Sequence, residues 1–182
     1  MQNDKEIMFA VKAGDLDKLG ILFERHHLRM YNYFLKATYQ PQTSEDLVQE
    51  VFFRLLKFRN TYRGDGLFTT WLYRVAQNVL YDHVRKKKTG TSIDDVVEQM
   101  TSDDDVHKDY EMSEEVKILE KAFCMLKDSD RELLTLKRFQ ELKYEEIAKI
   151  KNLAVGTIKS KIHHAIKNLK TIYIELSDEA KL

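Results

Sequence analysis

Apolar residues recur along most of the chain at intervals of three and four, the spacing that places them on one face of an α-helix. This pattern predicts an early helix that stops near Gly14 and a second helix that starts after Asp15. The inward stripe of the second helix comprises Leu19, Leu22, Phe23, Met30, Phe34 and Ala37. One proline and six glycines leave little material for turns between strands. We therefore expect an all-α fold.

Two more helices are predicted in the first half of the chain. Pro41 marks a break, and Thr43 with Asp46 three residues later has the spacing of a capping box that opens the third helix. Its inward side chains are Leu47, Val48, Val51, Phe52 and Leu55. A short loop then precedes a fourth helix, which closes in the basic run 85–88. Cations at that end suit the negative pole of the helix dipole.

The second half carries a helix-turn-helix pattern. Amphipathic helices are predicted over 116–126 and 131–139, with Asp128 or Ser129 as the N-cap between them. A short helix over 144–150, a turn and a longer helix from Val155 follow. The outward face of the last helix carries Lys159, Ser160, His163, His164 and Lys167. Such a face can read a major groove, although a solvated helix of a small bundle would look similar.

The distribution of charge divides the chain into three parts. Thirty basic residues balance thirty acidic ones, and a net charge of zero by itself argues against a nucleic-acid binder. However, residues 1–90 carry a balance of +5 and residues 116–182 a balance of +4, whereas residues 91–115 carry −9. Closely spaced like charges repel and extend a chain. We expect two small helical domains, 1–90 and 116–182, joined by an acidic flexible linker over 91–115.

The sequence offers no chemistry of its own for an enzyme. Cys124 is the only cysteine and stands in an apolar run, which favours a small core residue over a reactive thiolate. The adjacent pairs His26–His27 and His163–His164 point to different sides of a helix and suit no single metal ion. No window is apolar enough for a membrane span, and no leader pattern opens the chain. We expect a cytoplasmic protein with no cofactor, no metal and no membrane insertion.

Four motifs in a fixed order carry a family resemblance. They cover residues 45–52, residues 62–65 with 68–76, residues 144–148 and residues 155–160. Together they resemble the extracytoplasmic-function (ECF) sigma factors of bacterial RNA polymerase, and the similarity runs from about Asp15 to Leu169. A stand-alone helix-turn-helix regulator would account for the last two motifs but leaves the first two unexplained.

The resemblance implies that the first domain is similar to sigma region two. That region binds the clamp helices of the largest polymerase subunit and opens the minus-ten promoter element. Asp46, Gln49 and Glu50 occupy the motif positions that contact polymerase. Acids and an amide at this spacing share one helix face and suit a basic partner helix. Capping and solvation are the alternative roles of the two acids.

The resemblance also assigns promoter contacts to the segment that follows. Opening DNA requires compensation for unstacked base pairs, by aromatic stacking or a pocket for a flipped base. The matching minus-ten positions are Tyr62, Arg63, Asp65, Trp71, Arg74 and Asn78, with Arg85 and Lys86 as phosphate contacts. Trp71 serves equally well as a core residue. Gln77 stands where many relatives carry arginine.

The second domain resembles region four, whose recognition helix reads the minus-thirty-five element. The matching positions are Thr157, Lys159, Ser160, His163, His164 and Lys167. Lysine lacks the planar fork with which arginine reads guanine, so the promoter sequence stays open. Asn152 and Glu141 replace common glycines, and Asn tolerates the left-handed backbone that the turn needs.

The implied partners are core RNA polymerase, promoter DNA and an anti-sigma factor. On core polymerase, the family contacts the clamp helices and the flap of the second-largest subunit. The acidic linker of the family threads the RNA path, where Asp103, Asp104 and Asp105 here would mimic the charge of a transcript. The alternative is a merely solvated connector.

Overall fold

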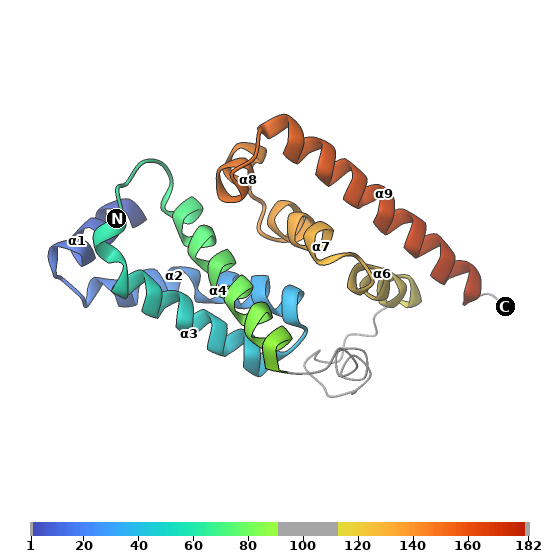
Figure 1. Ribbon diagram of the computed structural model, residues 1–182, viewed down its shortest axis with the longest axis horizontal. Helices are drawn as coiled ribbons and strands as arrows, with labels where there is room; N and C mark the ends of the chain where they lie inside the picture. Colours follow the sequence, from blue (N-terminus) through green and yellow to red (C-terminus); the bar gives the residue numbers. More distant parts are fainter. Residues whose placement is uncertain (1, 91–112, 181–182) are drawn as a thin grey trace.

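The computed structural model describes residues 2–90 and 113–180, and within these two ranges the regular structure is entirely helical. The first half contains α1 (Asp4–Ala13), α2 (Lys18–Thr38), α3 (Pro41–Lys57), the short turn η1 (Arg59–Thr61) and α4 (Phe68–Gly90). The second half contains α6 (Glu114–Cys124), α7 (Asp128–Leu134), the π-helical turn η2 (Thr135–Phe139), α8 (Tyr144–Lys151) and α9 (Val155–Glu179). The all-α prediction is confirmed, and the two groups of helices lie side by side (Figure 1).

The proposed roles of the acidic segment concern residues 91–112, which lie outside the described residues. The flanking boundary differs slightly from the expected one, because α6 begins at Glu114 rather than at Val116. Glu114 and Glu115 form the first turn of that helix, where acidic side chains suit the positive end of the helix dipole.

The first half is built on the predicted apolar stripes. Leu22, Met30 and Phe34 of α2 are fully buried, and Leu47, Val51 and Leu55 of α3 pack in the same core. The core continues into α4 through Leu72, Ala76 and Val79. Because these positions recur at helical spacing, the packing of three helices follows from the sequence pattern.

Two predicted helix starts are wrong. α3 begins at Pro41 itself, with Gln40 as the N-cap, so Thr43 and Asp46 lie inside the helix and form no capping box. Proline is well suited to the first helical position, because its missing N–H has no partner there in any case. In the second half, Lys127 is the N-cap of α7 rather than Asp128 or Ser129.

The helix-turn-helix prediction is confirmed. α8 ends at Lys151 and is capped by Asn152, whose φ of 52° places it in the left-handed region and whose N–H donates to the carbonyl of Ala148. Glu141 has a φ of 55°, so both replacements for the common glycines keep the expected turn conformation. α9 then starts at Val155 and extends to Glu179.

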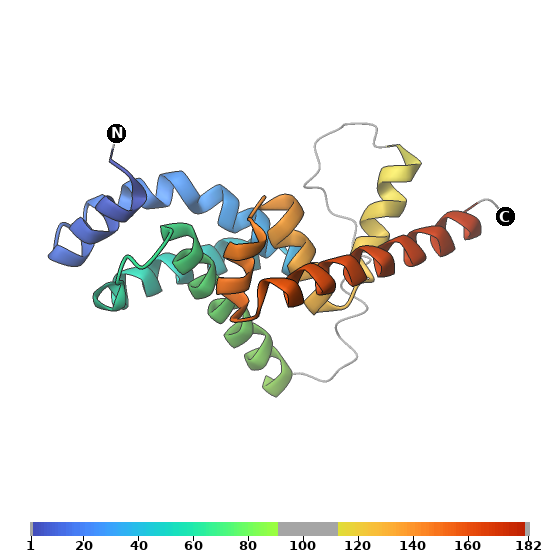
Figure 2. The same ribbon diagram turned by 90° about the horizontal axis from the view of Figure 1, so that it is seen from above.

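The two halves pack directly on each other, with α4 against α8 and α2 against α7 and η2 (Figure 2). At the centre lies the carboxylate of Glu132, whose Oε1 accepts hydrogen bonds from Tyr33 Oη and Gln77 Nε2, each at 3.1 Å. Its Oε2 pairs with the Lys151 ammonium, and both side chains of this pair are only 12% exposed. Burial and the nearby Glu132 charge raise the pKa of Tyr33, so its hydroxyl stays protonated and donates.

Further polar contacts extend this interface. Tyr73 Oη donates to Oε1 of Gln140 at 2.6 Å, and both residues are buried. Arg74 donates through Nε and Nη2 to the carbonyl of Lys149, at 3.0 and 2.6 Å. Gln77 stands where many members of the family that the sequence resembles carry arginine. In this fold its side-chain amide donates a hydrogen bond to Glu132.

Replacing Glu132 with alanine should separate the two halves. The change removes the acceptor of two hydrogen bonds and leaves the Lys151 ammonium buried without its partner, which costs about 3 to 5 kcal/mol. We expect a larger radius of gyration in small-angle X-ray scattering and a lower urea midpoint for unfolding.

Two variants serve as controls for this prediction. Glu175→Ala removes an exposed charge from α9 and should leave both measurements unchanged. The double variant Glu132→Leu/Lys151→Met removes both charges together and should recover much of the lost stability. If Glu132→Ala has the same scattering curve and the same urea midpoint as the wild type, the carboxylate does not hold the halves together.

Candidate functional site

The exposed face of α3 carries the predicted polymerase contacts. Asp46 and Gln49 are exposed, one turn apart. Glu50 is partly exposed and its Oε1 accepts from Arg54 Nε at 2.7 Å. Arg54 also bonds Asp82 of α4 at 2.7 Å, and this hydrogen bond lowers the pKa of the Asp82 carboxyl. Of the two acids among the predicted contacts, Asp46 is therefore the more exposed.

Sequence reasoning missed Phe53 at this site. Its ring is 58% exposed, although the neighbouring Phe52 is buried in the core. Phe53 follows Gln49 by four residues and therefore lies on the same helix face. The available signal was an aromatic residue outside the inward stripe of α3, because such residues on a polar face are typical of protein contact surfaces.

A pocket of about 360 Å³ opens where the loop before α4 meets the start of that helix. It is lined by Thr61, Tyr62, Arg63, Gly64, Asp65, Gly66, Leu67, Thr70, Trp71 and Arg74. Gly64 and Gly66 have φ values of 71° and 121°, which residues with a Cβ rarely adopt. This pocket gathers most of the predicted minus-ten residues in one place.

The predicted minus-ten residues differ in how they meet solvent. Tyr62 is only 2% exposed, and its ring lies 4.9 Å from that of Trp71, so it supports the pocket wall from inside. Trp71 packs against the core and also lines the pocket, which combines its two expected roles. Arg63 and Asp65 are exposed.

The other minus-ten candidates follow along α4. Arg74 lies on the pocket rim, and its guanidinium donates two hydrogen bonds to the carbonyl of Lys149 in the second half. Asn78 is exposed one turn further along. Arg85 and Lys86 are exposed near the end of the helix, and Arg85 Nη2 pairs with Asp82 at 2.9 Å. α4 therefore presents a polar and largely basic edge next to the pocket.

Helix α9 presents the predicted minus-thirty-five residues outward. Ile158, Ile162 and Ala165 are buried. The exposed candidates are Thr157, Lys159, Ser160, His163, His164 and Lys167. Because the buried stripe fixes the rotation of α9, all six are available to a partner at once. The ammonium of Lys159 lies 5.7 Å from the ring centre of Tyr144 in α8, which orients it at the start of this face.

The described residues hold neither a site for a metal ion nor a membrane-spanning helix. Within 2–90 and 113–180, no three His, Cys, Asp or Glu side chains cluster in a way that could bind a metal. In the same ranges, no helix combines the length and apolar character needed to cross a bilayer. Cys124 is partly buried at the end of α6.

Comparison with known families agrees with this geometry. The Sigma-70 region 2 family matches residues 22–89, and the Sigma-70 region 4 family matches residues 117–169. The chain is 30% identical to the ECF RNA polymerase sigma factor SigM of Bacillus subtilis, over 84% of this chain and 93% of SigM. It is 29% identical to SigW of the same organism, over 88% and 91% of the two chains. It is 28% identical to the ECF sigma-E factor of Escherichia coli K12, over 89% and 90%.

Solved structures show the same fold. CnrH, determined in complex with the cytosolic domain of CnrY, superposes with a TM-score of 0.70 at 18% identity, over 93% of this chain and 96% of CnrH. The sigma factor RpoE of Bartonella quintana, determined with the anti-sigma factor NepR, gives 0.68 at 22% identity, over 84% and 94%. The chain therefore belongs to the sigma-70 family, as an ECF sigma factor that directs promoter-specific transcription and has no catalytic role of its own.

Proposed function

We propose that the exposed face of α3 binds the clamp helices of the largest polymerase subunit. The observation that carries this proposal is the grouping of Asp46, Gln49 and Phe53 on one exposed helix face. An acid, an amide and an exposed aromatic ring together suit a partner helix that is basic and partly apolar. Glu50 contributes at the edge of this face, where Arg54 orients its carboxylate.

The pocket before α4 receives a base of the opened minus-ten element. Its volume lies within the range of pockets that bind small organic groups, and its wall includes the ring of Trp71. A flipped base gains stacking on an aromatic ring and hydrogen bonds at its edge, which offset the energy of unstacking. Arg63 and Asp65 supply a donor and an acceptor at the rim, and Asn78 follows on the adjacent helix face.

The outer face of α9 reads the minus-thirty-five element as duplex DNA. Its exposed Thr, Ser, Lys and His side chains lie on a single face that fits a major groove. Because the buried stripe of α9 packs on the second half, the helix enters the groove as a rigid element.

Reading both elements requires the two halves to separate. The elements are centred about 25 base pairs apart, which is about 85 Å of B-form DNA. In this structure α4 contacts α8 directly, with Arg74 bonded to the Lys149 carbonyl at 2.6 Å. One pair of touching helices cannot lie on sites so far apart, so core polymerase binds an open form of the chain.

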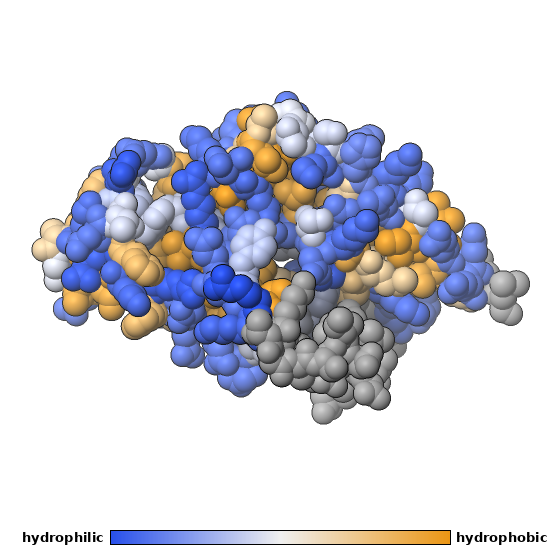
Figure 3. Space-filling view, viewed as in Figure 1, coloured by the Kyte–Doolittle hydropathy of each residue, from blue (hydrophilic) through white to orange (hydrophobic). Residues whose placement is uncertain are grey.

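The second half carries an exposed apolar surface, formed by α6 and α9, that suits binding to another protein. Val116 and Leu119 of α6 and Ile174 of α9 are exposed, and apolar atoms gather between these helices in Figure 3. Exposed apolar side chains grouped in this way are typical of protein contact surfaces. We assign the flap of the second-largest polymerase subunit to this surface. An anti-sigma factor would inhibit by covering it together with the α3 face, and the complex of RpoE with the anti-sigma factor NepR supports such control here.

Run-off transcription with core bacterial polymerase tests the polymerase face. We expect promoter-specific transcripts from a template pool, and their loss in the variant Asp46→Ala/Gln49→Ala/Glu50→Ala. Phe53→Ala should weaken core binding by about thirtyfold, because an aromatic anchor at an interface is worth about 2 kcal/mol.

The matched control is Glu24→Ala, which removes an exposed acid from α2. It should leave core affinity and transcription unchanged. If Phe53→Ala and the triple variant bind core polymerase as tightly as the wild type does, the clamp helices do not bind this face.

Two lysines of α9 separate base reading from phosphate binding. Lys159 lies near the N-terminal end of the outward face of α9, where we expect its ammonium to contact base edges. Lys159→Ala should therefore reduce discrimination between minus-thirty-five sequences by about 1 to 3 kcal/mol. Lys170 is exposed further along the helix, where we expect it to contact phosphate. Lys170→Ala should therefore weaken DNA binding by the same factor on every sequence and reduce the slope of log affinity against log salt concentration by about 1. Holoenzyme binding to promoter duplexes at several salt concentrations measures both, and equal losses on every sequence for the two variants would contradict the assignment.

A further inference from the structure

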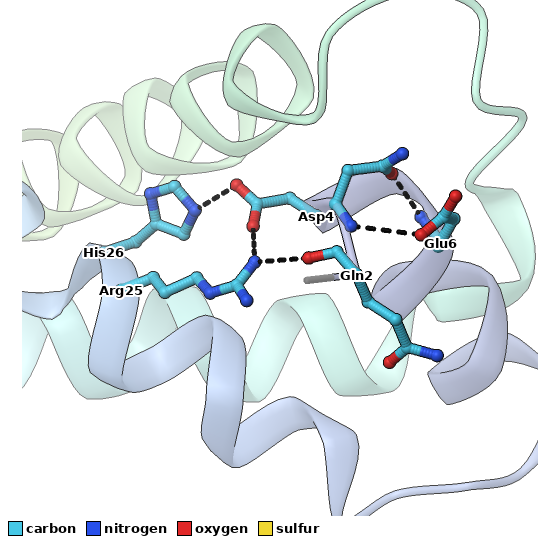
Figure 4. Close-up of polar contacts among 6 residues, drawn as sticks. Gln2, Asp4, Glu6, Arg25 and His26 are labelled. Atoms are coloured by element: carbon cyan, nitrogen blue, oxygen red, sulfur yellow. Dashed lines mark hydrogen bonds and ion pairs between the residues drawn. The ribbon is translucent and has the colours of Figure 1, made fainter.

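Helix α1 lies before the segment matched by the region 2 family, which begins at residue 22. It is nevertheless firmly fixed to α2 (Figure 4). Asp4 pairs with Arg25 Nη1 at 2.6 Å and with His26 Nε2 at 2.7 Å, and Arg25 also donates to the carbonyl of Gln2 at 3.1 Å. Burial opposes ionisation of Asp4, but the hydrogen bonds from Arg25 and His26 outweigh it and lower the pKa of this carboxyl.

Side chains of α1 also contact the loop that forms the pocket. Lys12 Nζ donates to the carbonyl of Tyr62 at 2.7 Å, and the ring centres of Phe9 and Tyr62 are 5.3 Å apart. A Cβ placed on Gly64 would lie 2.6 Å from Phe9 Cζ and 2.9 Å from Lys5 Cε. The loop therefore rests closely on α1, and the Phe9 ring and the Lys5 chain of α1 leave no room for a side chain at Gly64.

The loop holds part of its own shape, because the N–H of Gly66 donates to the carbonyl of Gly64 at 2.9 Å and Tyr62 packs on Trp71. It contains two glycines with positive φ, and glycine is the residue with the most backbone freedom to lose on ordering. A pocket that selects one base over another must already have its shape when the base arrives, because ordering it on binding would cost affinity and discrimination. The anchor against α1 meets this requirement from outside the loop.

We infer that α1 is part of the minus-ten recognition apparatus, with Phe9 and Lys12 as positioning residues that set the shape of the pocket through Tyr62 and Gly64. This inference rests on the proposed role of the pocket in binding a flipped base. Phe9 and Lys12 touch the loop rather than the DNA. Their effect is on which minus-ten sequences are accepted.

Transcription from a pool of promoters with randomised minus-ten segments tests the inference. Holoenzyme is assembled with the full chain carrying Phe9→Ala or Lys12→Met, and the transcripts are sequenced. We expect the preference between the best and the poorer minus-ten sequences to fall by about two- to tenfold in each variant, the size that follows from losing one aromatic contact in Phe9→Ala or one hydrogen bond in Lys12→Met. Core affinity should stay within about twofold of the wild type, because the α3 face is untouched. Phe9→Leu should restore most of the preference.

The control Leu28→Ala changes a side chain of α2 that is 65% exposed and should not alter the preference. The inference is overturned if Phe9→Ala and Lys12→Met keep the wild-type sequence preference, or if they reduce transcription equally on every minus-ten sequence. A pocket variant, Asp65→Ala, separates this failure from that of the proposed function. Changed preference in Asp65→Ala alone would refute the role of α1, whereas unchanged preference in all three variants would refute the role of the pocket as well.

Discussion

The arrangement of the molecule depends on one buried carboxylate. Glu132 in α7 accepts hydrogen bonds from α2 and α4 through Tyr33 and Gln77, and pairs with Lys151 at the end of α8. Removing these charges from water is costly, and the cost is met only when each group finds its partners. Since the partners come from both halves of the chain, the network is complete only when the halves are packed together. The position of the surfaces of the first half relative to the outward face of α9 follows from that requirement.

This packing and the proposed promoter contacts use the same helix. α4 carries Arg74 and Gln77, which bond the second half in this structure, and also Trp71 and Asn78, which face the pocket or solvent. In the proposed open form, which would reach two distant promoter elements, Arg74 would exchange its contacts with the second half for contacts with DNA. A ligand shifts such an equilibrium only by its preference for one form. To favour the proposed open form, binding to polymerase and promoter must therefore offset the free energy with which the Glu132 network stabilises the packed form.

Local pattern and long-range contact differ in how far they can be predicted from sequence. The helices and the helix-turn-helix follow from apolar spacing. The left-handed conformation of Asn152 could be predicted because few residues besides glycine accept it and asparagine is one of them. The start of α3 was misjudged because Thr43 and Asp46 match a capping pattern that the preference of Pro41 for the first turn overrides. The Glu132 network had no local signal, since polar partners far apart in sequence leave no periodicity. Phe53 was overlooked because the apolar stripe beside it already accounted for the helix.

Tyr62 shows most clearly why a motif does not by itself define a binding site. The motif places this residue among the DNA contacts, but in the fold its ring is covered by Phe9 and Trp71 and its carbonyl is held by Lys12. The backbone on which Arg63 and Asp65 stand is thus positioned by a helix some fifty residues earlier in the chain. Two chains with the same loop but different first helices would present those side chains at different angles. Because hydrogen bonds to a base weaken steeply with misalignment, such chains would read different promoters.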